Sequence, residues 1–254
     1  MNSDLYLLAH PDDELFLMPL LRNVEVKHRI VFLTNGQVKG GPPPSKRQGE
    51  VRRALADFPG VEVTWLGIES QIDVYDLINR LDVAFRGLCA IAAQPDPIRR
   101  ILTHAWEGGH PDHDAAHLLA QQLAGQLGIR DPSASLPYYR APRRGPVPFL
   151  VMSPLTENGQ ATTIRISWRE AVRTISKTLN YPSQLVPLLG LAPGLLLQLL
   201  VRRRLHLQSL SGSLWPARPT KGKLLYEKRN GLSFPQFDAA QQTFFVTINK
   251  DRNQ

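Results

Sequence analysis

The first 150 residues alternate between short apolar runs and longer segments with a helical apolar period, and this alternation restricts the fold more than any other feature. The apolar runs predict strands at residues 5–9, 29–34, 61–67, 99–105 and 146–152. The segments between them predict helices at residues 12–22, 45–58 (with Ser45 as N-cap), 72–92 and 112–127. Strands that alternate with helices favour an α/β fold, with a Rossmann-like, mostly parallel sheet and helices on both of its faces.

Beyond residue 155 the pattern becomes less regular. One strand is predicted at residues 161–167 and an amphipathic helix at residues 167–179, and a leucine-rich segment follows. We therefore expect a first domain of residues 1–155 and a helical and stranded extension of residues 156–254. The extension is expected to pack on the first domain or to shape its cleft.

Composition describes an ordinary globular protein, with 43% hydrophobic and 20% charged residues. The single cysteine, Cys89, allows no internal disulfide, which is typical of a reducing compartment. The first fourteen residues lack the basic and long apolar regions of a signal peptide. These features together predict a cytoplasmic protein.

Charge is divided unequally along the chain, whose formal net charge is +8. Residues 1–127 carry 12 lysines and arginines against 16 aspartates and glutamates, whereas residues 128–254 carry 18 against 6. The basic half contains the most apolar segment, residues 185–204, which ends in three arginines. Two prolines and two glycines make this segment short and broken for a membrane span, so a buried helix or a peripheral contact with an anionic membrane surface is favoured.

Histidines and aspartates gather at the ends of two predicted strands. The run "LYLLAHPDDE" ends in His10 and three acids, and "THAWEGGHPDHDAAH" follows the strand at residues 99–105. Five of the seven histidines lie at or just beyond strand ends. A helix N-terminus would explain the acids, because carboxylates are favourable there, but it would leave the histidines unexplained.

The spacing within both clusters favours a metal site. His10 and Asp13 lie three residues apart across a strand-to-helix turn, and His110 and His113 have the same separation. In a doubly wound sheet the first strand neighbours the first strand after the order reverses, and their carboxyl ends form the ligand crevice. Catalytic zinc typically takes three nitrogen or oxygen ligands and keeps one position open. Residues 1–155 are therefore predicted to form a metal-binding catalytic domain.

The two motifs "AHPDDE" and "HPDHDAAH", in this order and separation, resemble those of the PIG-L/LmbE-like zinc-dependent N-deacetylases, which include N-acetylglucosaminyl-phosphatidylinositol de-N-acetylases. The resemblance covers residues 4–130. It implies one Zn²⁺ per chain, with another divalent ion as an alternative, bound by His10, Asp13 and His113. It also implies that Asp12 is the general base and that His110 acts as a general acid or stabilises the oxyanion.

Further positions match the family pattern less closely. "TNG" at residues 34–36 and the R-x-x-E spacing of Arg47 and Glu50 resemble its substrate-facing loop and helix start, which makes Asn35 and Arg47 candidate substrate-binding residues. Glu14 and Asp112 are candidates to support the ligands from behind.

The leading hypothesis is a zinc-dependent hydrolase that removes acetyl from a small N-acetylated amino sugar of the N-acetylglucosamine type, free or linked to a lipid or nucleotide. Two alternatives stay open: a protein that binds a membrane surface or nucleic acid through its basic half, and a metal-dependent phosphoesterase. The phosphoesterase would need more carboxylates for two metals. Nucleic acid is a disfavoured partner because no basic–aromatic motif occurs. An oligomer is compatible with the sequence.

Overall fold

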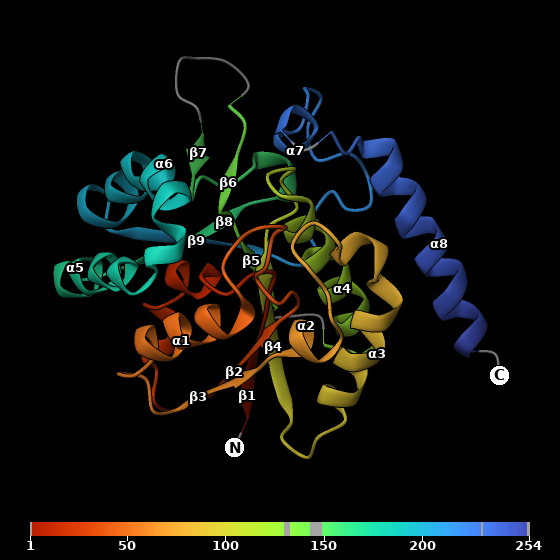
Figure 1. Cartoon of the computed structure of the whole chain (residues 1–254), viewed down its shortest axis with the longest axis horizontal. Coiled ribbons are helices and arrows are strands. Elements are labelled where there is room, and N and C mark those ends of the chain that lie inside the picture. Colours follow the sequence, from red (N-terminus) through yellow and green to blue (C-terminus); the bar gives the residue numbers. More distant parts are fainter. Residues whose placement is uncertain (1, 130–132, 143–148, 230, 253–254) are drawn as a thin grey trace.

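A single mixed sheet organises the protein in the computed structural model, which describes residues 2–129, 133–142, 149–229 and 231–252 (Figure 1). Within these residues the sheet has seven strands in the order β3-β2-β1-β4-β5-β9-β8. The parallel strands are β1 (Ser3–Leu8), β2 (Lys27–Phe32), β3 (Val61–Thr64), β4 (Ile98–His104) and β5 (Ala134–Leu136). β9 (Arg204–Ser209) pairs antiparallel with β5, and β8 (Ala161–Arg165) pairs antiparallel with β9. The predicted α/β fold with a mostly parallel sheet is confirmed.

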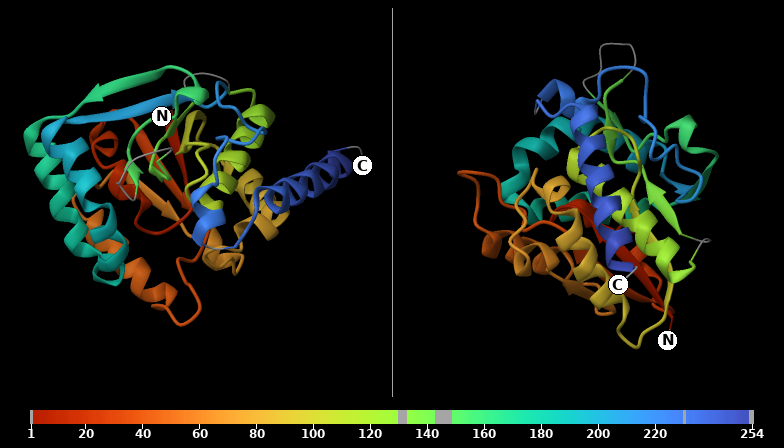
Figure 2. Two further views of the ribbon diagram at one scale, coloured as in Figure 1. Left: turned by 90° about the horizontal axis from the view of Figure 1, so that it is seen from above. Right: turned by 90° about the vertical axis from the view of Figure 1, so that its right-hand side faces the viewer.

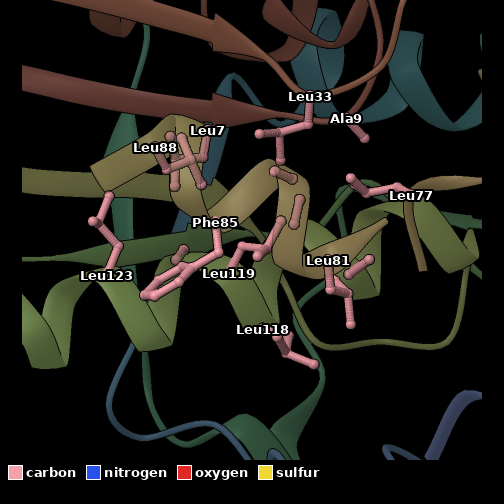
Figure 3. Close-up of a cluster of buried hydrophobic side chains, with 14 of the residues drawn as sticks. Leu7, Ala9, Leu33, Leu77, Leu81, Phe85, Leu88, Leu118, Leu119 and Leu123 are labelled. Carbon is pink, nitrogen blue, oxygen red and sulfur yellow. The ribbon is translucent and has the colours of Figure 1, made fainter. Parts of the chain in front are cut away.

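Helices cover both faces of this sheet because its central strands are apolar on both sides. Leu5 and Leu7 of β1 belong to one buried cluster, and Tyr6 and Leu8 belong to the other. Such strands, buried on both faces, are typical of parallel sheets. Figure 3 shows part of the first cluster, in which Leu7 and Leu88 lie with Phe85 and Leu119 between the sheet and two helices.

One face carries α3 (Leu81–Ala92) and α4 (Pro111–Leu127), with α8 (Phe234–Arg252) packed on the outside of α3. The second face carries α1 (Pro44–Ala54), α5 (Trp168–Lys177) and α6 (Leu185–Leu196). Figures 1 and 2 show α5 and α6 together at one edge of the molecule and α8 at the opposite edge. The short helices are α2 (Leu66–Glu69), α7 (Leu225–Arg229), η1 (Asp13–Phe16), η2 (Leu20–Arg22), η3 (Leu77–Asn79), η4 (Thr156–Asn158), η5 (Thr178–Asn180) and η6 (Pro182–Gln184).

Several predicted elements differ from the observed ones. The helix expected at residues 12–22 consists of the two 3₁₀ turns η1 and η2. α1 begins at Pro44 with Pro43 as its N-cap instead of Ser45, because proline fits a first helical turn, where its missing N–H costs nothing. In the strand expected at residues 146–152, residues 146–148 lie outside the described chain. The described part holds only β7 (Leu150–Val151), which pairs with β6 (Tyr139–Arg140) in a separate two-stranded sheet.

The chain beyond residue 155 contributes to the same sheet through β8 and β9. α6 continues into the π-helical segment η7 (Leu197–Val201). By length and composition, Pro182–Val201 is the one helix of the described chain that could cross a membrane, although one such helix is weak evidence for a span. The division near residue 155 stays a prediction.

Candidate metal centre

The candidate site lies where β1 and β4 end side by side. The two strands are parallel neighbours, with Leu7 opposite Thr103, so the residues after both strands meet at one edge of the sheet. His10 follows β1, and His104 is the last residue of β4. The neighbouring placement of the first strand and the strand before the second motif is as the sequence predicted.

The second motif forms the start of α4. His110 is extended, and its Nδ1 accepts the N–H of Asp112 at 3.2 Å as an N-cap. Pro111 occupies the first helical turn, and Asp112 and Asp114 follow within it, which suits the positive end of the helix dipole. This helix start turns His113 toward the end of β1.

Asp13 is the centre of the cluster. Its Oδ1 lies 3.3 Å from Nε2 of His113, and its Oδ2 lies 3.3 Å from Nε2 of His104 and 3.6 Å from Nδ1 of His10. Oδ2 also accepts the backbone N–H of His10 at 2.7 Å. Burial works to raise the pKa of Asp13, but His113 and His104 hold it well below its usual range. The structure therefore brings the predicted ligands His10, Asp13 and His113 together.

The donor atoms of His113 fit a metal ion. Both ring nitrogens are buried, and neither has a hydrogen-bond partner among the described residues. Burial lowers the pKa of His113 to about 3, so the ring is the neutral imidazole that binds metals. Two overlapping groups of side chains have ligand atoms within 4.8 Å of one another: His10 with His110 and His113, and Asp13 with His104 and His113.

Hydrogen bonds occupy one ring nitrogen on each of three histidines in these groups. Nε2 of His104 accepts the N–H of Ala9 at 3.0 Å, and Nδ1 of His110 is occupied by the N–H of Asp112. His10 bonds Asp112 through Nε2 at 3.0 Å, which turns Nδ1 toward Asp13. A carboxylate behind a histidine in this way orients a metal ligand. These contacts fit the predicted ligand set, while the individual roles stay predictions.

Asp12 has a strained backbone beside the ligands. Its φ of 131° is rare for a residue with a side chain and costs on the order of 1–3 kcal/mol. Its N–H donates to Oε2 of Glu14 at 2.9 Å, and its Oδ1 accepts from Arg47 at 3.0 Å. Burial raises the pKa of Asp12 to about 6, although Arg47 opposes the shift. The carboxylate is thus held by Arg47 next to Asp13, the predicted metal ligand.

Arg47 lies behind Asp12, and its side chain is only 2% exposed. It donates to the carbonyl of Pro11 and to Asp12, and it also bonds Ser183 at 3.0 Å and Glu50 at 3.3 Å. All these partners belong to the protein. Direct contact of Arg47 with substrate stays a prediction, whereas its support of Asp12 is observed.

Glu14 is fully buried and supports the same loop. It accepts from the N–H of Asp12 and from the hydroxyl of Tyr181. Burial raises the pKa of Glu14 to about 8, despite the bond from Tyr181. Its place behind Asp12 suits the supporting role that the sequence suggested.

Asn35 is also largely committed to the protein. Its side-chain amide donates to Asp73 at 2.6 Å, and its Oδ1 accepts the N–H of Gln37 at 2.8 Å. The side chain is buried, and contact with substrate stays a prediction. The backbone just before Asn35, after the end of β2, packs closely against Gly67. A Cβ at Gly67 would lie 2.1 Å from the carbonyl carbon of Thr34.

Several residues of the site were not found from the sequence. Tyr75 stacks on His110, with ring centroids 4.6 Å apart, and its N–H donates to Asp112. Tyr138 donates to the carbonyl of Asp13 at 3.0 Å, and Tyr139 packs edge-on against His113. The tyrosine pair "YY" follows β5, a three-residue strand too short to show periodicity. Recognition of that strand would have placed the pair at the crevice.

Histidines and a carboxylate at the carboxyl edge of a parallel sheet define a class of protein, the α/β enzymes with a metal-binding site in the sheet crevice. Residues 5–124 match the family model PIG-L, described as GlcNAc-PI de-N-acetylase, and this part of the chain belongs to that family. The protein is accordingly a hydrolase of the N-deacetylase type. No curated protein matches the chain significantly.

Several solved structures share the fold, among them two deacetylases. The A40926 pseudoaglycone deacetylase is 19% identical with a TM-score of 0.52, and the match covers 74% of this chain and 84% of that one. A deacetylase of the teicoplanin biosynthesis pathway is 16% identical with a TM-score of 0.51, covering 73% and 86%. A conserved protein from Thermus thermophilus is 18% identical with a TM-score of 0.50, covering 86% and 96%.

Proposed function

We propose that the protein is a zinc-dependent hydrolase that removes the acetyl group from an N-acetylated amino sugar of the N-acetylglucosamine type. The observation that carries this proposal is the convergence of His10, Asp13 and His113, with Asp12 next to Asp13 in the chain. The buried Nδ1 of His113 also has no hydrogen-bond partner among the described residues. The family match over residues 5–124 supports amide hydrolysis over phosphoester hydrolysis.

His10, Asp13 and His113 would hold the metal. A bound zinc ion polarises an amide carbonyl and lowers the pKa of water toward 7. Three ligands from two loops leave room for further coordination, as catalytic zinc sites require.

Asp12 is suited to accept a proton from the attacking water. Its side chain is 21% exposed, whereas its neighbour Asp13 is 7% exposed and turned to the histidines. Arg47 and Glu14 fix the position of Asp12, so the carboxylate needs little rearrangement to act as general base.

His110 is suited to donate a hydrogen bond to the developing oxyanion. Burial, together with His10 and His113, lowers its pKa well below the ordinary range, so the ring is neutral near neutral pH. Since Nδ1 accepts the N–H of Asp112, the proton of the neutral ring lies on Nε2. A neutral donor favours oxyanion stabilisation over proton donation to the leaving amine.

Acetate release from N-acetylated sugars, free, nucleotide-linked and lipid-linked, tests the proposal together with the metal content of the purified protein. His113→Ala is expected to lose both metal and activity, and Asp12→Asn to keep the metal and lose turnover. His206→Gln, which replaces a buried histidine on β9, is the matched control and should keep both. A His113→Ala protein with full metal content, or an Asp12→Asn protein with full turnover, would contradict the assigned roles.

A further inference from the structure

The leucine-rich helix has an apolar surface that the fold leaves uncovered. Its inner side is buried and consists of Leu188, Leu191, Leu195 and Leu199. The opposite side, called the outer face, has side chains that are 40–82% exposed. It consists of Leu185, Val186, Leu189, Leu196, Leu197 and Val201. A helix that is apolar on all sides is ordinarily buried, so an exposed half indicates that something else covers it.

Exposed apolar residues are concentrated around this helix. Among the described residues, nine of the fifteen exposed large hydrophobic side chains lie between Trp168 and Val201. Trp168 and Val172 of α5 are 55% and 45% exposed, and α5 lies with α6 at the same edge of the molecule (Figures 1 and 2). Scattered exposed hydrophobics are ordinary, but a concentration of this kind marks a site of interaction.

The charge next to the outer face is strongly positive. Arg202 and Arg203 are exposed and directly follow Val201, and Arg169 and Arg173 are exposed on α5. Residues 161–204 contain seven lysines and arginines but only one acidic residue. Leucine and tryptophan beside exposed arginines are the composition of helices that lie in the surface of an anionic membrane.

The helix is not free to cross a bilayer in this fold. Leu199 is fully buried, and a Cβ at Gly194 would lie 2.6 Å from Cβ of Val151, so the inner side is packed tightly on β7. Gln198 donates to the carbonyl of Val151 as well. A spanning orientation would expose these groups to lipid on the side that now forms the core, whereas an in-plane orientation leaves the core intact.

A second copy of the chain is a poorer occupant of the outer face. In a two-fold dimer the same surface meets itself, so the arginines that border the face would approach arginines of the other copy. Glu170 is the one acidic residue of residues 161–204, and Asp57 pairs with Arg173 and Lys177. Among the described residues no ion pair neutralises Arg202 or Arg203. An anionic lipid surface removes this repulsion and adds attraction.

We propose that the outer face of α6 and η7 docks in the plane of an anionic phospholipid bilayer, with Arg202 and Arg203 at the headgroups. This surface is connected to the residues behind the candidate metal centre through the preceding turn η6. At its N-terminal end Ser183 bonds Arg47, which in turn bonds Asp12. Docking therefore places the helix that follows Ser183 at the lipid–water boundary, and this orientation does not depend on the acyl group or sugar that is hydrolysed.

Vesicle co-sedimentation of the metal-loaded full chain tests this proposal. We expect binding to phosphatidylcholine vesicles with about one third phosphatidylglycerol, weak binding to pure phosphatidylcholine, and loss of binding at high salt. Arg202→Gln with Arg203→Gln should weaken binding roughly thirtyfold, since each arginine near an anionic surface contributes about a factor of five. Arg52→Gln with Lys250→Gln, two exposed cations elsewhere, is the matched control and should change binding little.

The apolar part is tested by Leu189→Gln with Leu197→Gln, both exposed, against the exposed control Val246→Gln on α8. The pair should reduce binding at least tenfold while circular dichroism and thermal unfolding stay as in the wild type. The proposal fails if wild-type protein binds neither vesicle, or if these variants bind as well as their controls. It also fails if alkaline carbonate does not extract the bound protein, which indicates a span, or if the outer-face variants dissolve a dimer seen by sedimentation velocity.

Discussion

Replacement of Glu107 by glutamine is expected to change how the stability of the protein depends on pH. Glu107 is 2% exposed, and its Oε1 accepts the N–H groups of Tyr138 and Tyr139 at 2.7 and 3.0 Å. Its Oε2 has no hydrogen-bond partner among the described residues. Burial raises the pKa of Glu107 from its ordinary 4.5 to about 7, and the two backbone N–H groups only partly oppose the shift.

These pKa values determine how Glu107 changes the free energy of unfolding with pH. The folded protein holds the proton of Glu107 more tightly than the unfolded chain does, so the carboxyl stabilises the fold most at low pH. That contribution is lost as the pH rises from about 4.5 to about 7. Each pH unit in this interval costs about 1.4 kcal/mol, so the loss amounts to roughly 3 kcal/mol. Glutamine keeps an oxygen for the two N–H groups and has no proton to lose.

Urea unfolding of wild type and Glu107→Gln at pH 5 and pH 8, at equal metal loading, measures this effect. We expect free energies of unfolding within about 1 kcal/mol of each other at pH 5, and the variant to be more stable by roughly 2–3 kcal/mol at pH 8. Other titrating groups contribute the same pH dependence to both proteins, so their effect cancels in the difference between the two free energies of unfolding. A stability difference that is the same at both pH values would refute the reasoning, because Glu107 would then carry no proton linkage.

Three further substitutions test the packing around the site. Tyr181→Phe removes the hydroxyl that donates to the buried Glu14, and urea unfolding should show a loss of about 1–3 kcal/mol. Gly67→Ala places a Cβ 2.1 Å from the backbone of Thr34, so unfolding should show a loss of about 1–3 kcal/mol and the NMR signals of the following loop should shift. Leu119→Ala, fully buried in the cluster of Figure 3, should cost about 2–5 kcal/mol, whereas Leu127→Ala, 37% exposed on the same helix, should cost less than about 1.

The place of the candidate site could be predicted because short motifs of histidine and aspartate follow the ends of two strands. His10 and His113 lie about a hundred residues apart, but both follow strands that a parallel sheet makes neighbours. The rule that ligands bind at the carboxyl edge of such a sheet needs only the order of elements. β5 was not predicted, since three residues carry no detectable period, and the tyrosines after it were missed for that reason.

The C-terminal part was harder to predict because its residues do not determine which side of an element is covered. The leucine-rich segment is apolar around its whole circumference, so its sequence favours burial of every side equally. The fold buries only the side that faces β7, and the other side is left to solvent or to a partner. Which half is exposed depends on tertiary packing, which local periodicity does not contain.

Asp12 shows the same limit at the level of one residue. "HPDDE" reads as an acidic helix start, and η1 does begin with Asp13 and Glu14. Asp12 itself adopts φ 131°, a conformation that its own sequence disfavours. The partners that hold it come from elsewhere in the fold: Arg47 of α1 directly, and Tyr181 through Glu14. The motif therefore makes Asp12 a candidate general base, whereas its strained position is fixed by residues that only the fold brings to it.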